Sequence, residues 1–144
     1  WQSEIEKFSS NLTSLIVHGS SDDRKVLIQN CKDYDVIITS YDYLKRDVEQ
    51  YEQFDFMYLI IDEAQYIKNH NTKNALSVKQ IHAKHRFALT GTPIENSLAE
   101  LWSIFDFLMP GYLFDYRYFS QNFEKEIMLE LRQFLNDVEK FGEA

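Results

Sequence analysis

The 144-residue chain is predicted to fold as a three-layer α/β domain with a mostly parallel sheet. Two observations predict this class. Short apolar runs alternate along the chain with longer segments whose apolar residues recur at helical spacing. Each run also ends abruptly at small or polar residues, as buried parallel strands do where their carboxyl ends open onto a polar site.

Composition indicates one globular domain, because 44% of the residues are hydrophobic and 15% are aromatic. The sequence contains no secretion signal and no apolar run long enough to span a bilayer. The single cysteine, Cys31, excludes an internal disulfide, suits a reducing compartment and is expected to be a small core residue. A net charge of −8 argues against tight nucleic-acid binding by this chain alone.

The pattern of residues 1–30 predicts two helices and a strand. Residues 1–8 have apolar residues at helical spacing but no capping residue, so we expect the middle of a longer structure. Residues 15–18 form a short strand that Gly19 closes. The serines and aspartates at 20–23 then supply capping oxygens and negative charge to a helix that reaches about Asn30.

The next segment predicts a strand at residues 35–39 and a helix that begins after Ser40. From its own chemistry, Ser40 is an ordinary helix cap. The helix carries four apolar or aromatic residues on one side: Tyr41, Leu44, Val48 and Tyr51.

Residues 58–69 are the stretch around which the chain is organised. A run that reads as a fully buried strand ends at Asp62 and Glu63, at the sheet edge where ligands bind in open α/β sheets. One carboxylate there can hold magnesium, and the other can orient an attacking water. The alternative is that the two acids only cap the helix that follows.

A polar loop at residues 69–71, a helix at 72–81 and a strand at 86–89 come next, and the strand ends in Thr-Gly-Thr-Pro. Ser97 and Glu100 have the spacing of a capping box. The helix they begin is ended by Pro-Gly at residue 110, and its predicted core stripe is Leu98, Leu101, Trp102, Phe105 and Leu108.

After an aromatic-rich loop, residues 116–123 are predicted to form a short helix. From Ile127 to the end, apolar residues keep helical spacing but have no obvious partner in so small a domain. We expect this terminal helix to pack on a second lobe or on another copy of the chain. His82 and His85, three residues apart without paired cysteines, are expected to be a surface pair.

Positive charge is concentrated between residues 64 and 94, which contain no acidic residue. This basic island comprises Lys68, Lys73, Lys79, Lys84 and Arg86. A solvated helix face explains such a cluster as readily as a surface on which a phosphate backbone rests.

Three motifs carry a resemblance to a known family. Residues 58–69 read YLIIDEAQYIKN, residues 87–110 contain LTGTP followed by ENSLAELWSIFDFL, and residues 35–44 read DVIITSYDYL. Together they resemble motifs II, III and Ib of the Swi/Snf-type ATPases, the double-stranded-DNA translocases within the helicase-like superfamily that includes chromatin remodellers. The resemblance covers nearly the whole chain up to about Ile127.

The resemblance implies a RecA-like fold that uses ATP and magnesium. It implies that Asp62 binds magnesium, that Glu63 polarises the hydrolytic water and that Gln65 couples the site to the opposite lobe. Histidine is the commoner family residue at the position of Gln65, which leaves the details of coupling open. Thr90, Gly91 and Thr92 would carry the relay of motif III.

The resemblance also implies partners, namely double-stranded DNA and a second RecA-like lobe. Thr39, Ser40 and Lys68 would touch the DNA backbone. We expect no membrane partner, and a homo-oligomer could form through an exposed sheet edge or the terminal helix. The location would be cytoplasmic and nucleoid-associated in a bacterium, which the DEAQ sequence favours, or nuclear in a eukaryote.

The sequence contains no GxxxxGK[ST] loop, so this chain is expected not to cradle ATP phosphates unaided. We therefore expect residues 1–127 to be the latter part of a first RecA-like lobe and residues 128–144 to lead towards the remainder. Alone, the piece would be inactive. Two alternatives remain, a catalytically inert interaction module and a lobe of an RNA helicase.

Overall fold

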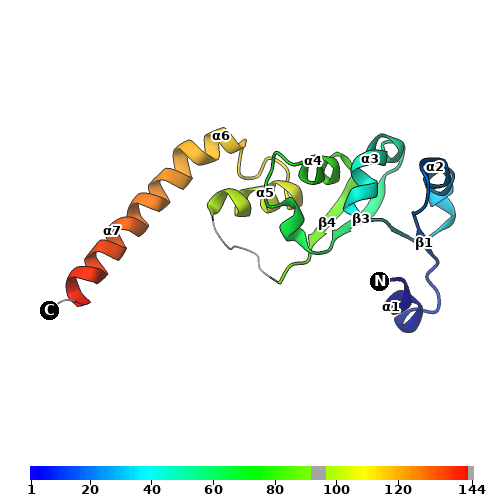
Figure 1. Cartoon of the computed structure of the whole chain (residues 1–144), viewed down its shortest axis with the longest axis horizontal. Helices are drawn as coiled ribbons and strands as arrows, with labels where there is room; N and C mark the ends of the chain where they lie inside the picture. The colour runs from blue at the N-terminus through cyan, green and yellow to red at the C-terminus, as the bar shows by residue number, and fades with distance from the viewer. Residues whose placement is uncertain (92–96, 143–144) are drawn as a thin grey trace. The chain divides into compact units, whose positions relative to one another are not determined.

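The computed structural model describes residues 1–91 and 97–142, with the side chains of the last helix described through Gln133. The chain forms two compact units. The first unit comprises residues 1–59 and 71–85, and the second comprises residues 60–70 and 86–144. Figure 1 labels most of the helices and strands of the two units.

The first unit contains the N-terminal helices and strands in the predicted alternation. Its complete elements are α1 (Gln2–Phe8), β1 (Ser14–Ile16), α2 (Ser21–Gln29), the 3₁₀ turn η1 (Cys31–Asp33), β2 (Val36–Ile38), α3 (Tyr41–Tyr51) and α4 (Lys73–Gln80). β1 and β2 pair in parallel, with Leu15 opposite Ile37. Helices α3 and α4 pack against each other, as Figure 1 also shows.

Helix α2 begins as the sequence predicts, with a capping box at Ser20 and Asp23. The Ser20 hydroxyl accepts the Asp23 N–H at 3.2 Å, and the Asp23 carboxylate accepts the Ser20 N–H at 3.0 Å. The Ser20 hydroxyl and the Ser20 N–H both donate to the Asp23 carboxylate, and these bonds hold the pKa of Asp23 below its ordinary value. Gly19 precedes the cap at φ +97°, a conformation that glycine adopts without a steric cost.

The core of the first unit is apolar and includes the single cysteine. Cys31 is buried as predicted, and burial raises the pKa of its thiol to about 11. The other buried apolar residues are Leu15, Val17, Ile28, Leu44, Tyr51, Phe54, Ala75, Val78 and Ile81.

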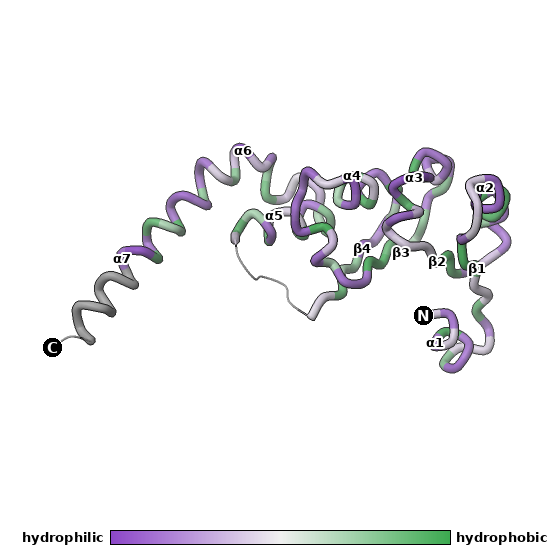
Figure 2. The backbone as a smooth tube through the Cα atoms, in the orientation of Figure 1, coloured by the Kyte–Doolittle hydropathy of each residue, from purple (hydrophilic) through white to green (hydrophobic). Residues whose placement is uncertain are grey.

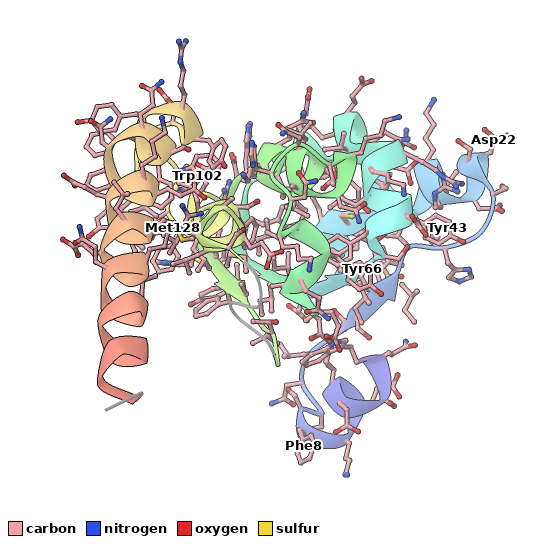
Figure 3. The ribbon with its side chains drawn as sticks, turned by 60° about the vertical axis from the view of Figure 1, so that its left-hand side comes forward. Phe8, Asp22, Tyr43, Tyr66, Trp102 and Met128 are labelled. Atoms are coloured by element: carbon pink, nitrogen blue, oxygen red, sulfur yellow. The ribbon has the colours of Figure 1, made fainter. Side chains whose placement is uncertain are left out.

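A buried ion pair joins α2 to α3, and the sequence patterns do not reveal it. Arg24 donates to both carboxylate oxygens of Asp47, at 2.5 and 3.0 Å, and to the Gly19 carbonyl at 2.9 Å. The guanidinium also lies over the ring of Tyr43, which Figure 3 labels. This two-point pairing fixes the relative position of the two helices.

Strands β3 (Phe56–Ile61) and β4 (Ala83–Ala88) run through both units and pair in parallel. Phe56 N–H donates to the His82 carbonyl at the start of the strands, and Leu89 N–H donates to the Ile61 carbonyl at their end. β4 begins at Ala83, three residues before the predicted start of this strand at Arg86.

The prediction of a fully buried central strand is wrong for β3. Met57, Tyr58 and Ile60 are 55%, 58% and 59% exposed. Within the described residues β3 belongs to a two-stranded sheet, and such a sheet leaves much of its apolar surface open. Figure 2 shows hydrophobic colour along much of β3.

The second unit continues from the ends of β3 and β4 into helices. It contains the 3₁₀ turn η2 (Ala64–Ile67), α5 (Leu98–Leu108), α6 (Tyr116–Phe119), the π turn η3 (Ser120–Glu124) and α7 (Lys125–Gly142). The predicted core stripe of α5 needs correction. Only Trp102 of that stripe is buried, because the helix turns the side of Ser103, Ile104 and Phe107 towards η2 and β4.

Helix α7 confirms the predicted terminal helix and leaves apolar side chains exposed in its described part. Those side chains are Ile127, Met128, Leu129 and Leu131. Figure 2 shows hydrophilic and hydrophobic stretches alternating along this part of α7. Among the described residues, no helix is both long and apolar enough to cross a membrane.

Candidate functional site: the ends of β3 and β4

Asp62 and Glu63 emerge, exposed, at the carboxyl end of β3. Two backbone hydrogen bonds of 2.9 Å join this end to β4, from Leu89 N–H to the Ile61 carbonyl and from Ala64 N–H to the Leu89 carbonyl. The acids therefore lie beside the segment that follows β4 and contains Leu89 and Thr90. This is the juxtaposition that the sequence predicts for a ligand site.

Glu63 has an unusual backbone conformation, with φ 51° and ψ 56°. A left-handed conformation is costly for a residue with a side chain and persists only where the surroundings hold it. The Asp62 carboxylate accepts the Glu63 N–H at 2.9 Å. Glu63 makes no side-chain capping bond to η2, so the alternative that this carboxylate serves as a helix cap is wrong.

Gln65 connects the acidic pair to β4. Its Nε2 donates to Glu63 Oε2 at 2.7 Å, and its Oε1 accepts the Thr90 hydroxyl at 3.2 Å. The predicted site residues Glu63, Gln65 and Thr90 are thus joined by one amide group. Gly91 follows Thr90 and is exposed, and Thr92 lies outside the described residues.

Behind the acidic turn, α5 holds the end of η2. The fully buried Ser103 hydroxyl donates to the Ile67 carbonyl at 2.6 Å. Lys68 Nζ lies 3.4 Å from Glu100 Oε1, so this predicted DNA contact already has an acidic neighbour. The predicted capping box at Ser97 forms in one direction, from Glu100 N–H to the Ser97 hydroxyl, while the Glu100 carboxylate lies near Lys68.

Aromatic rings extend the contact between the acidic turn and α5. His70 lies against Tyr116 at 4.2 Å between ring centroids and edge-on to Trp102 at 5.3 Å, with Trp102 labelled in Figure 3. From β4, Arg86 Nη1 donates to the Phe107 carbonyl at 3.0 Å, and burial lowers the pKa of Arg86. The sequence patterns do not predict the contact of Ser103 with η2, and the one available signal is a serine between apolar residues on a helix.

The predicted DNA-contacting turn lies in the first unit. Ser40 is exposed, and its hydroxyl accepts the Tyr43 N–H at 3.3 Å, as a helix cap does. Thr39 Oγ1 is buried near the Tyr51 hydroxyl, and burial raises the pKa of Tyr51. Of the basic island, Lys73 and Lys84 are exposed, whereas Lys68 and Arg86 contact α5.

The donor set fits a magnesium ion held mainly by a nucleotide. Among the residues that the structure describes, no group of three or more His, Cys, Asp or Glu side chains is placed to hold a metal. Magnesium is typically bound by one or two carboxylates together with water and substrate phosphates. The exposed Asp62 carboxylate at a strand end can serve in that way.

The fold and the site define the class of protein: the chain belongs to the SNF2-related domain family, whose match spans residues 1–141. Its parallel α/β architecture is that of the RecA-like ATPase core of this family.

Sequence comparison identifies particular relatives of the chain. The chain is 45% identical over 130 residues to the TATA-binding protein-associated factor BTAF1 of Arabidopsis thaliana. It is 40% identical over 127 residues to the TATA-binding protein-associated factor MOT1 of Saccharomyces cerevisiae. These matches cover 89% and 88% of the chain but 6% and 7% of the relatives.

A solved structure shows the same fold. The Sulfolobus solfataricus SWI2/SNF2 ATPase core in complex with double-stranded DNA matches with a TM-score of 0.78 and 42% identity. The match covers 89% of this chain and 26% of that one. The chain therefore spans about a quarter of a solved ATPase core.

Proposed function

We propose that the chain is part of an ATP-dependent double-stranded-DNA translocase that remodels protein–DNA complexes. One observation carries the proposal, namely the bridge from Glu63 through Gln65 to Thr90 at the ends of β3 and β4. An acid at a strand end that is bonded to the neighbouring chain segment suits an enzyme that hydrolyses a nucleotide. The bond can transmit a movement of the acid during hydrolysis to that segment. Membership of the SNF2-related family supports the ATPase class.

In the proposed mechanism, Asp62 would hold a magnesium ion, which would supply positive charge to stabilise the reacting phosphates. Glu63 orients and polarises the attacking water, and it is exposed as such a base must be. Gln65 holds the Glu63 carboxylate in place through one hydrogen bond, and through its other hydrogen bond it transmits movement of that carboxylate to Thr90. Gly91 and Thr92 complete the relay segment.

The DNA-binding part of the proposal rests on the turn at Thr39 and Ser40, which follows β2, and on the similarity of the chain to its relatives. Ser40 is exposed at the start of α3, where backbone amides and a hydroxyl suit a phosphate. Because its hydroxyl is buried, Thr39 would contribute through its backbone. Lys68 would reach DNA by leaving Glu100. A solved relative in complex with double-stranded DNA supports this choice of partner.

The first experiment replaces Glu63 by Gln in the complete ATPase that carries this chain. Loss of the base is expected to lower kcat at least about a hundredfold, since general-base catalysis contributes that much, while nucleotide binding persists. Glu49→Gln, an exposed acid on α3, is the matched control and should leave kcat unchanged. Absence of ATPase activity in the unaltered protein would favour the inert interaction module, whereas full activity in Glu63→Gln would contradict the role proposed for Glu63.

A second measurement separates the DNA translocase from an RNA helicase. The ATPase rate is measured with duplex DNA and with RNA at one salt concentration, since affinity for either polymer depends on salt. Stimulation by duplex DNA alone supports the proposal. Equal or greater stimulation by RNA contradicts it.

A further inference from the structure

Ser103 is a buried polar residue on α5 whose hydroxyl bonds to another element. It lies between Trp102 and Ile104, is 0% exposed, and donates to the Ile67 carbonyl at 2.6 Å. Serine hydroxyls inside helices commonly bond to the preceding turn of their own helix. Because the Ser103 hydroxyl instead bonds to the end of η2, it links α5 to that turn.

The carbonyl that Ser103 reaches needs a partner. η2 is a single 3₁₀ turn from Ala64 to Ile67, and the last carbonyls of any helix have no partner within it. Ile67 is 0% exposed, so bulk water does not reach it. A buried carbonyl left unsatisfied is costly, and the Ser103 hydroxyl removes that cost.

The opposite end of the same short turn carries Glu63. There Ala64 N–H donates to the Leu89 carbonyl, and Glu63 has its left-handed backbone. The five residues 63–67 are therefore held at both ends, by Leu89, which follows β4, at one end and by Ser103 at the other. Loosening either point lets the costly backbone of Glu63 relax.

We propose that Ser103 is a positioning residue for Glu63. Its hydroxyl fixes the end of η2, and the fixed turn keeps the Glu63 carboxylate aimed at the attacking water. The proposal rests on the hydrolytic role proposed above for Glu63. A displacement of about 1 Å in a catalytic group is enough to cost a large part of the rate.

A purely structural role for Ser103 makes a different prediction. If the hydroxyl only satisfied the core, its loss would loosen the whole unit and would not act specifically on the turn. Ser77 offers the matched comparison, because it is also a helical serine, is 4% exposed, and donates to Asn74 within its own helix α4. Ser77→Ala removes the same chemical group without releasing another element.

The first test measures amide hydrogen exchange in the 144-residue chain. Two amides report on η2, those of Tyr66 and Lys68, which bond to Glu63 and Gln65. Ser103→Ala is expected to speed their exchange about tenfold, the effect of losing one hydrogen bond, with the amides of α4 unchanged. Ser77→Ala should leave both η2 amides unchanged. The proposal is overturned if Ser103→Ala speeds exchange equally at all amides of the chain, or if it does not speed exchange at the two η2 amides.

The second test measures ATPase kinetics in the complete ATPase. Ser103→Ala is expected to lower kcat about tenfold and to leave the KM for ATP within about twofold, because a positioning effect acts in the transition state. Ser103→Cys keeps much of the volume but donates weakly, so it should resemble Ser103→Ala. Full activity in Ser103→Cys assigns the role to volume and overturns the proposal.

Failure of this inference differs from failure of the proposed function. If neither the unaltered protein nor Glu63→Gln hydrolyses ATP, the proposed function fails while the exchange result still decides whether Ser103 holds the turn. If the protein hydrolyses ATP and Ser103→Ala keeps its kcat, only the inference about Ser103 fails.

Discussion

Gln65 joins the two halves of the site through one neutral amide. Nε2 donates to Glu63 and Oε1 accepts from Thr90, so both ends of the group are used. An amide does not titrate near neutral pH, whereas a histidine has an ordinary pKa of about 6.5. A glutamine at this position therefore keeps the bridge intact across the pH range in which a histidine bridge would change charge.

The bridge predicts that Gln65 and Thr90 act as a pair. Gln65→Ala and Thr90→Val each remove it, so in the complete ATPase the double variant should lose little more activity than either single variant. The expected coupling in a double-mutant cycle on kcat/KM is about 0.5–1.5 kcal/mol, the net worth of one hydrogen bond.

The control cycle combines Gln65→Ala with Asn122→Ala, an exposed residue that bonds to Tyr118. These two changes share no partner and should add. Additive losses in Gln65→Ala with Thr90→Val would show that the contact between these two side chains does not operate during turnover.

At the scale of elements, α2 and α3 are held together by a buried charge pair. Arg24 and Asp47 are both nearly unexposed and meet at two points. The bond to Asp47 raises the pKa of Arg24, so the guanidinium remains charged. Because Ser40 begins α3, the pair also determines where the proposed DNA-contacting turn lies relative to α2.

Breaking this pair is expected to destabilise the first unit. Asp47→Asn leaves a buried guanidinium without its charged partner and should lower the midpoint of thermal unfolding by several degrees. Circular dichroism of the chain measures the shift. Asp42→Asn, which removes an exposed pair with Lys45 on the same helix, is the control and should shift the midpoint much less. Equal shifts in both variants would contradict the inferred importance of burial.

At the scale of the whole molecule, the apolar side of α7 remains exposed in the described residues. Ile127 and Leu131, one helical turn apart, are 39% and 49% exposed. Apolar surface of this kind favours association with a partner, and we predict that a second lobe or a second copy of the chain covers it.

In the isolated chain, a second copy is the available partner. We expect sedimentation velocity to show concentration-dependent association that weakens when Ile127 and Leu131 are both changed to Lys, because two charges then enter the apolar surface. Gln133→Lys adds a charge to an exposed polar position of the same helix and should change association little. A chain that stays monomeric at all concentrations would leave the second lobe as the expected partner.

Much of the element order could be predicted from the sequence. The helix starting at Ser21 was predicted from its serines and aspartates, and the Ser40 cap from its position after an apolar run. Side-chain environments were harder. Tyr58 and Ile60 were expected to be buried, and no local pattern predicted the burial of Ser103, because burial depends on which elements come together in space.

The sequence by itself determined the family, the position of Asp62 and Glu63 at a strand end, and the parallel α/β class, since local spacing encodes each of these. Only the tertiary structure decided that Gln65 joins Glu63 to Thr90 and that Ser103 holds the end of η2. The physical reason is distance along the chain. Hydrogen bonds between residues 25 and 36 positions apart form only after strands and helices pack, and no local pattern specifies them.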